Sequence, residues 1–243
     1  MNISNSADFI ISAVAVIVAL TVHEFFHSFT AYKLGDPTPG AQGRLSLNPI
    51  HHLDPIGAIC LLVFNFGWAK PVPINTRYFK NPKRDFALTA MAGPISNLLL
   101  AFLSGMVYVL TYKLQGDSGN DFVARVIQVS CYFFFTLLVM NLGLGIFNLI
   151  PIPPLDGSRL LSALLPNKAY FKLLKYEGTI YRVFIFWLLL GTPVYNLLMG
   201  IDFIASNSIL RSVFSILSIG NLISRAVSFL GEYIIKFWVL CLY

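Results

Sequence analysis

Long apolar segments alternate with short polar ones along most of this 243-residue chain. A helix needs about 20 mainly apolar residues to cross the hydrocarbon core of a bilayer, and four segments reach that length. They are residues 7–31, 86–112, 126–150 and 181–203, the second interrupted at Gly93-Pro94. Residues 209–243 are apolar but carry scattered charges, which predicts either one further span or a pair of interfacial helices.

The segment between the first two spans has another pattern, because Pro, Gly and Asn recur in it. Residues 44–47 and 71–75 are strand-like, and residues 56–66 are apolar but too short to span. We therefore predict an α-helical polytopic membrane protein with about five to six transmembrane segments. A short membrane-associated β-like or re-entrant region follows the first span. No linker separates domains, so residues 1–243 are expected to form one intramembrane domain.

Composition supports a membrane protein. Apolar residues make up 56% of the chain and charged residues only 12%, with a mean hydropathy of +0.72; soluble domains carry about 25% charged residues. The net charge of +6 fits basic cytoplasmic loops, so no nucleic-acid partner is expected. The three cysteines, Cys60, Cys131 and Cys241, lack ligand spacing and are interpreted as packing residues. The first apolar segment lacks the flanks of a cleaved signal peptide and is expected to be a retained span.

Basic residues predict the orientation in the membrane. Residues 31–84 contain seven Lys and Arg and residues 157–182 contain five, against two in residues 113–125. Basic loops face the cytoplasm, so the first two of these segments are predicted to be cytoplasmic and the N-terminus to be outside.

Three ionisable residues interrupt the first apolar segment as His23-Glu24-Phe25-Phe26-His27. Each such group costs roughly 2–3 kcal/mol within a bilayer if it lacks a partner, and a zinc ion would compensate that cost. Positions i and i+4 share one face of a helix, so both imidazoles can reach one ion. Glu24 then projects beside that face, where it can touch a metal-bound water without binding the metal.

Catalytic zinc needs a third protein ligand and an open position. The other two histidines, His51 and His52, lie in the irregular segment. Asp156 is the better candidate, because it follows a span in a proline-broken segment whose backbone must line a protein cavity. A plain turn role for Asp156 before Gly157 is an equally good interpretation of the residues alone.

Five motifs in a fixed order carry a resemblance to a known family. They are His23-Glu24-x-x-His27, Asn48-Pro49-x-x-His52-x-Asp54-Pro55-x-Gly57, Gly67-Trp68-Ala69-Lys70-Pro71-Val72-Pro73, Gly93-Pro94-x-x-Asn97 and Asn148-x-x-Pro151-x-x-Pro154-x-Asp156-Gly157. They run from His23 to Gly157, a stretch of more than half of the chain. With these motifs the chain resembles the site-2 protease family of intramembrane zinc metalloproteases, in particular its small prokaryotic members. It shows no PDZ-sized insertion between the core spans, unlike larger relatives.

The resemblance implies that His23, His27 and Asp156 bind Zn²⁺. It further implies that Glu24 is the catalytic acid and base, and that Asn148 polarises or positions the scissile carbonyl.

The remaining motif residues have simpler interpretations. His52 and Asp54 are expected to organise the irregular segment. Gly93 and Asn97 are one helical turn apart, which predicts close helix packing with a polar contact. Lys80, Lys83 and Arg84 are interpreted as a basic cluster that faces lipid headgroups.

The expected function is an integral, multi-pass zinc endopeptidase of the cell membrane. Its partners are the lipid bilayer and a membrane-protein substrate, cut within a transmembrane or signal-like segment near the cytoplasmic face. The strand-like residues 71–75 would bind the unwound substrate as an added strand. A catalytically silent scaffold of the same fold and a metal or ion transporter remain as alternatives, and the oligomeric state is left open.

Overall fold

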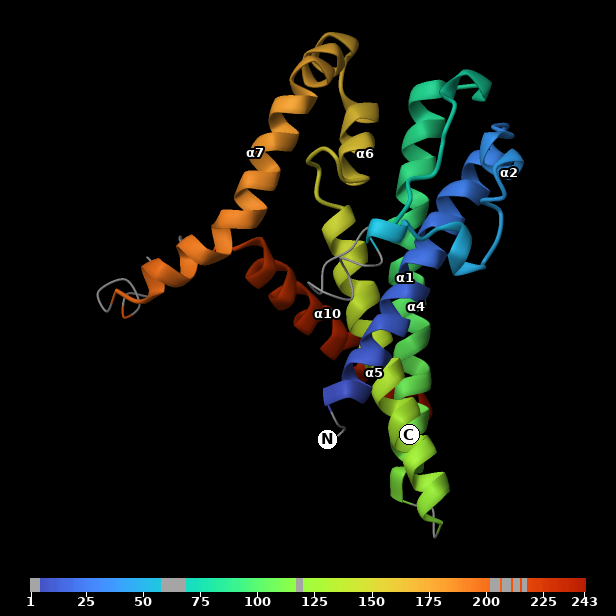
Figure 1. Ribbon diagram of the computed structural model, residues 1–243, viewed down its shortest axis with the longest axis vertical. Helices are drawn as coiled ribbons and strands as arrows, with labels where there is room; N and C mark the ends of the chain where they lie inside the picture. Colours follow the sequence, from blue (N-terminus) through green and yellow to red (C-terminus); the bar gives the residue numbers. More distant parts are fainter. Residues whose placement is uncertain are drawn as a thin grey trace.

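The computed structural model describes residues 5–57, 69–116, 120–201 and 218–243, with the single positions 206, 211 and 215. Five long helices dominate the described chain (Figure 1). They are α1 (Asn5–Lys33), α4 (Pro82–Lys113), α5 (Asp121–Asn148), α7 (Asn167–Met199) and α10 (Ile219–Leu242). The shorter elements are α2 (Thr38–Ala41), α6 (Gly157–Leu164) and the 3₁₀ turns η1 (Pro49–His51), η2 (Thr76–Tyr78) and η3 (Leu114–Gly116).

The helices α1, α4 and α5 run lengthwise side by side, and α10 slants against them, while α7 leans away (Figure 1). Ala101 of α4, Leu138 and Leu142 of α5 and Val227 of α10 form one buried apolar cluster. Small residues let these backbones approach closely, as is usual where lipid supplies no hydrophobic driving force between helices. Gly105 is one of them, since an added Cβ would lie 2.6 Å from Ile234 Cγ2 of α10.

Four helices are long and apolar enough to cross a membrane, with 27, 32, 28 and 32 residues in α1, α4, α5 and α7. This finding supports a helical membrane protein with four candidate spans. The fifth long helix, α10, has 24 residues, and three charged side chains, Arg225, Glu232 and Lys236, lie along it.

The interruption predicted within the second span does not occur, because α4 continues through Pro94. Proline is tolerated in a membrane helix when neighbouring groups bond the disturbed backbone. The carbonyl that Pro94 leaves without its helical donor is that of Ala90, and the bond from Ser96 Oγ to Gly93 O, 2.7 Å long, lies one turn beyond it. The basic segment at residues 157–182 is mainly helical, as α6 and the first turns of α7.

The two strand-like segments, residues 44–47 and 71–75, form no strand in the described chain; a single antiparallel bridge joins Leu53 to Ala69. Side chains bond the backbone there instead. The buried Arg44 donates to His51 O, Lys70 O and Pro71 O at 2.7–3.2 Å.

The carboxylate of Asp36, which is fully buried, accepts bonds from Thr38 N and Asn75 N and so holds the two ends of the irregular segment together. As expected, His52 and Asp54 organise this segment: His52 Nε2 donates to Ser46 O, and Asp54 Oδ1 caps the following turn. Most of the predicted re-entrant element at 56–66 lies outside the described residues.

Candidate metal centre

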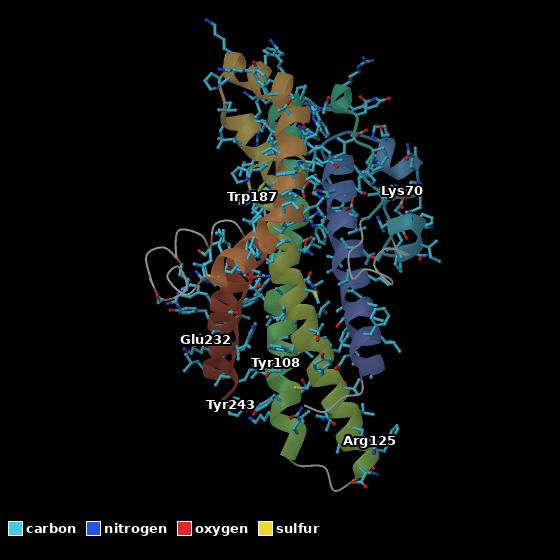
Figure 2. All side chains as sticks on the ribbon, turned by 60° about the vertical axis from the view of Figure 1, so that its left-hand side comes forward. Lys70, Tyr108, Arg125, Trp187, Glu232 and Tyr243 are labelled. Carbon is cyan, nitrogen blue, oxygen red and sulfur yellow. The ribbon has the colours of Figure 1, made fainter. Side chains whose placement is uncertain are left out.

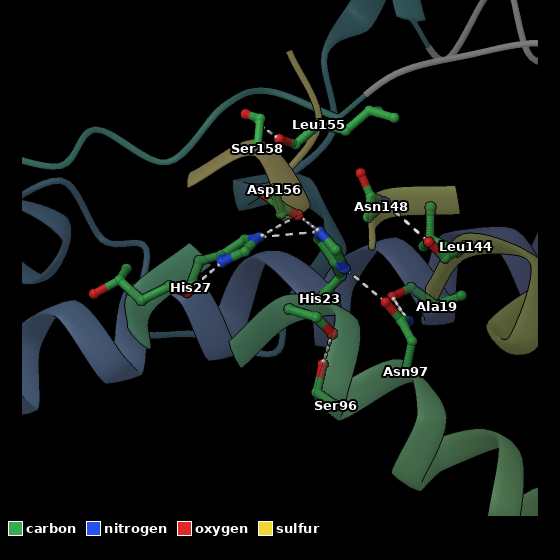
Figure 3. A network of polar contacts seen from close by, with 12 residues as sticks. Ala19, His23, His27, Ser96, Asn97, Leu144, Asn148, Leu155, Asp156 and Ser158 are labelled. Atoms are coloured by element: carbon green, nitrogen blue, oxygen red, sulfur yellow. Dashed lines mark hydrogen bonds and ion pairs between the residues drawn. The ribbon is translucent and has the colours of Figure 1, made fainter. Parts of the chain in front are cut away.

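Two imidazoles from α1 and one carboxylate after α5 meet in the middle of the bundle (Figure 3). His23 and His27 are only 4% and 6% exposed, and their Nε2 atoms are 3.0 Å apart. Their sequence spacing of four places both rings on the same face of the continuous helix α1, as the sequence predicted.

Asp156 reaches this point because the chain turns back after α5 and starts α6. Its Oδ2 lies 3.1 Å from His23 Nε2 and 3.3 Å from His27 Nε2. Gly157 permits the turn, since an added Cβ would collide with the carbonyl oxygens of Leu149 and Ile150. Although Asp156 precedes α6, its carboxylate makes no capping bond to that helix. The carboxylate is therefore directed at the imidazoles, and it does not stabilise the turn before Gly157, which was the alternative interpretation of the sequence.

The outer nitrogen of each ring is held by a hydrogen-bond acceptor. His23 Nδ1 donates to Asn97 Oδ1 at 2.6 Å, and His27 Nδ1 donates to Thr89 O at 2.8 Å. In a neutral imidazole the other nitrogen then carries a lone pair. With both rings neutral, the two Nε2 lone pairs and the Asp156 carboxylate converge as three acceptors, a set that can bind a cation or a proton.

Such a convergence of lone pairs is what a cation requires. Zinc binds imidazole nitrogen and carboxylate oxygen at 2.0–2.2 Å in a tetrahedron, which sets its ligand atoms about 3.3–3.6 Å apart. The three observed separations of 3.0, 3.1 and 3.3 Å reach the lower end of that range or lie a few tenths of an ångström below it. Within the described ranges this is the one group of His, Cys, Asp and Glu that could hold a metal ion. Three ligands leave the fourth vertex open, as in catalytic sites.

Helix α4 closes one side of the centre through Gly93. A Cβ at this position would lie 2.6 Å from His27 Cε1 and 2.7 Å from His23 Cε1, closer than real contacts allow. The close packing predicted at Gly93 is therefore confirmed, and it is made against the imidazoles themselves.

Asn97 is fully buried and joins three helices. Its Oδ1 accepts from His23 of α1, and its Nδ2 donates to Ala19 O and to Asn141 Oδ1 of α5. Asn141 Nδ2 is in turn bonded to Leu137 O. The polar contact expected at Asn97 is confirmed, and its partner is a candidate metal ligand.

The two remaining candidates border the centre without joining it. Glu24 is half-buried and makes no side-chain hydrogen bond or ion pair with any described residue. Asn148, near the end of α5, donates from Nδ2 to Leu144 O at 3.1 Å and lies beside Asp156 in Figure 3. Its amide oxygen has no hydrogen-bond partner in the described part of the chain, so both side chains remain available to a substrate.

Two contributors to the centre were missed in the sequence. Asn141 could have been found as an amide within an apolar span, where polar side chains are costly and usually paired. Thr89 acts through its backbone carbonyl, for which the sequence holds no signal.

The sequence is similar to those of known proteins. Residues 123–191 match the model of peptidase family M50. YwhC of Bacillus subtilis, a candidate zinc metalloprotease, is 42% identical over 181 residues, which cover 74% of this chain and 80% of YwhC. The chain belongs to peptidase family M50. It is accordingly a zinc metalloprotease of the site-2 protease type, as the motifs indicated.

More distant relatives are longer. Rip2 of Mycobacterium tuberculosis, another candidate zinc metalloprotease, is 31% identical over 58% of this chain and 52% of its own length. The zinc metalloprotease MJ0392 of Methanocaldococcus jannaschii is 28% identical over 73% of this chain and 41% of its own. No solved structure matches the chain significantly.

Proposed function

We propose that this M50 peptidase cuts membrane-spanning segments of other proteins, with His23, His27 and Asp156 as its zinc ligands. The observation that carries the ligand assignment is the convergence of three lone pairs at 3.0–3.3 Å, with both ring tautomers fixed by Asn97 and Thr89. With both rings neutral, these buried acceptors need a cation or a proton between them, and a bound metal ion would supply the positive charge.

The protein side chains supply the proton transfers. When bound by His23, His27 and Asp156, a zinc ion would lower the pKa of a coordinated water to around 7 and polarise the scissile carbonyl. Glu24, half-buried and unpaired in the described chain, accepts the proton of the attacking water and returns it to the leaving amine. Asn148 offers its amide to the substrate carbonyl and so positions it or stabilises the developing charge.

The depth of the centre supports a substrate within the membrane. His23 precedes the end of α1 at Lys33 by ten residues, which is about 15 Å along the helix axis. The basic segments 31–84 and 157–182 favour the cytoplasm for that end of α1. The cut is then made within the bilayer, on its cytoplasmic side.

A membrane helix hides its carbonyls in intrahelical bonds, so the substrate must unwind before it is cut. Residues 72–74 lie half-buried in a segment without regular secondary structure, and their backbone makes no hydrogen bond to any described residue. Half-buried backbone groups without a partner favour a segment that can pair with them. We propose that an unwound substrate pairs with these residues by main-chain hydrogen bonds, as in strand addition.

The test is Glu24→Gln in purified protein reconstituted in liposomes with a single-span substrate. This nearly isosteric change removes the base and leaves the three ligands in place. Cleavage should fall by at least about 100-fold, while zinc content stays at about one ion per chain. Undiminished cleavage by Glu24→Gln would contradict the assignment of the base, and zinc movement across the liposome without cleavage by either protein would favour a transporter.

A further inference from the structure

A concave site lies between the first turns of α4 and the short helix α6, apart from the metal centre. Its volume is about 560 Å³. Its lining combines two cationic side chains with an apolar floor from both helices, namely Lys83, Arg84, Leu88, Met91, Leu160 and Leu164. Nothing in the proposed peptidase mechanism uses this pocket.

The two cations have no acidic partner in the described chain. Lys83 Nζ donates to Leu165 O, just beyond α6, and lies 5.3 Å from the centre of the Tyr170 ring. These neutral contacts fix the position of its charge without neutralising it. Arg84 is exposed and makes no ion pair with a described residue. The adjacent Asp85 is buried and accepts from Asn81 N, so its carboxylate is directed at the start of α4.

The floor of the pocket is unusually open for apolar side chains. Leu88 is 44% exposed, Leu160 38% and Leu164 76%. Because α4 is a candidate membrane span that begins at Pro82, these residues lie where headgroups give way to acyl chains. Lys83 and Arg84, in the first turn, lie at headgroup level.

The surroundings of the pocket are basic as well. In Figure 2, nitrogen-tipped side chains gather at the end of the molecule that carries α6 and the starts of α4 and α7, and Arg125 marks the opposite end. Lys80, Lys168, Lys172 and Lys175 belong to the same basic segments. A positive field of this kind attracts anionic headgroups.

We propose that this pocket binds one anionic phospholipid, whose phosphate lies between Lys83 and Arg84 and whose acyl chains cover the leucines of α4 and α6. A soluble anion would satisfy the two cations but leave the apolar floor uncovered. A neutral lipid would cover the floor but leave the cations without a counter-charge. An anionic phospholipid matches both parts of the pocket.

Native mass spectrometry of detergent-purified protein, titrated with phosphatidylglycerol or with phosphatidylcholine of the same acyl chains, tests this site. The wild type should bind one phosphatidylglycerol at least about tenfold more tightly than phosphatidylcholine. Lys83→Gln/Arg84→Gln should lose this preference. The matched control Lys172→Gln/Lys175→Gln removes the same charge from exposed positions of α7 that do not line the pocket, and should keep it.

Two further experiments separate the contribution of the apolar pocket from that of the two cations. Ala163→Trp fills the space between the helices and should weaken phosphatidylglycerol binding by a similar factor. Glycerol phosphate, which has the anionic group but no acyl chains, should not compete with the lipid. Unchanged zinc content and helical circular dichroism show that each variant is folded, and Arg84→Gln alone, which breaks no bond in the described chain, replaces the double variant if that one unfolds.

Any one of four results would overturn the proposal. Equal affinity for the two lipids would remove the role of the cations. Equal weakening by the control pair would indicate diffuse surface attraction in place of a site. Full binding by Ala163→Trp, or competition by glycerol phosphate, would show that the apolar floor takes no part.

Discussion

The substitution Gly93→Ala places one methyl group against both imidazoles of the metal centre. Its Cβ would lie 2.7 Å from His23 Cε1 and 2.6 Å from His27 Cε1, whereas ordinary contacts begin at 3.4 Å, a shortfall of 0.7–0.8 Å. Helix α4 cannot retreat by that distance, because it already packs tightly against α5: a Cβ on Gly145 would lie 3.2 Å from Pro94 O. The rings must therefore move.

A zinc site tolerates about 0.2 Å in its ligand distances, so a displacement several times larger breaks the ligand geometry. We expect Gly93→Ala to lower zinc affinity by about 100-fold, which corresponds to about 2.7 kcal/mol. Competition with a zinc chelator, followed by elemental analysis of the protein, measures this change. Peptidase activity should fall in parallel and recover in part when zinc is added in excess.

Gly105→Ala is the matched control. It makes the same change on the same helix, and its Cβ would lie 2.6 Å from Ile234 Cγ2 and 3.1 Å from Leu138 Cδ1. The site is twelve residues from Gly93, about 18 Å along the helix. The control should lower the melting temperature while zinc affinity stays at the wild-type value. Wild-type zinc affinity in Gly93→Ala, or equal loss of zinc from both variants, would refute the packing argument.

Three further predictions follow from the same geometry. Asn97→Leu removes the acceptor of His23 Nδ1 and should lower zinc affinity 10- to 100-fold in chelator competition. Asn141→Leu removes only the hydrogen bond between Asn141 and Asn97 and should lower zinc affinity less. A larger loss in Asn141→Leu than in Asn97→Leu would contradict the network. In a cysteine-free background, Lys168→Cys should react with an impermeant thiol reagent only from the cytoplasm and Arg125→Cys only from outside, so the reverse pattern would overturn the orientation. Two glycines near the cut site of a Leu-rich substrate should speed cleavage up to about 30-fold, because each lowers the free energy of unwinding the substrate helix by about 1 kcal/mol. Equal cleavage rates with and without the glycines would contradict substrate pairing with residues 72–74.

The most reliable predictions from the sequence concern features that helix geometry alone determines. The spacing of His23 and His27 fixed their shared face, and four apolar segments predicted the four helices long enough to span. The family motifs pointed to Asp156, and the structure places its carboxylate against both imidazoles.

The rest depends on contacts that no local pattern encodes. The strand-like residues 44–47 and 71–75 do not pair with each other, because Arg44 and Asp36 bond the backbone there through their side chains. Pro94 was expected to interrupt α4, yet the helix continues through it, as membrane helices can where neighbouring elements pack around the proline. The carbonyl of Thr89 orients His27 only because α4 packs beside α1, and such a tertiary contact cannot be read from the local sequence.

The most direct test of the account is the zinc content of Asp156→Ala after the same purification as the wild type. The wild type should carry about one zinc per chain, because three ligands with an open vertex suit a catalytic zinc ion. Two imidazoles alone hold zinc weakly, so Asp156→Ala should retain well under half of that amount. Full zinc occupancy in Asp156→Ala would contradict the assignment of His23, His27 and Asp156 as the ligand set.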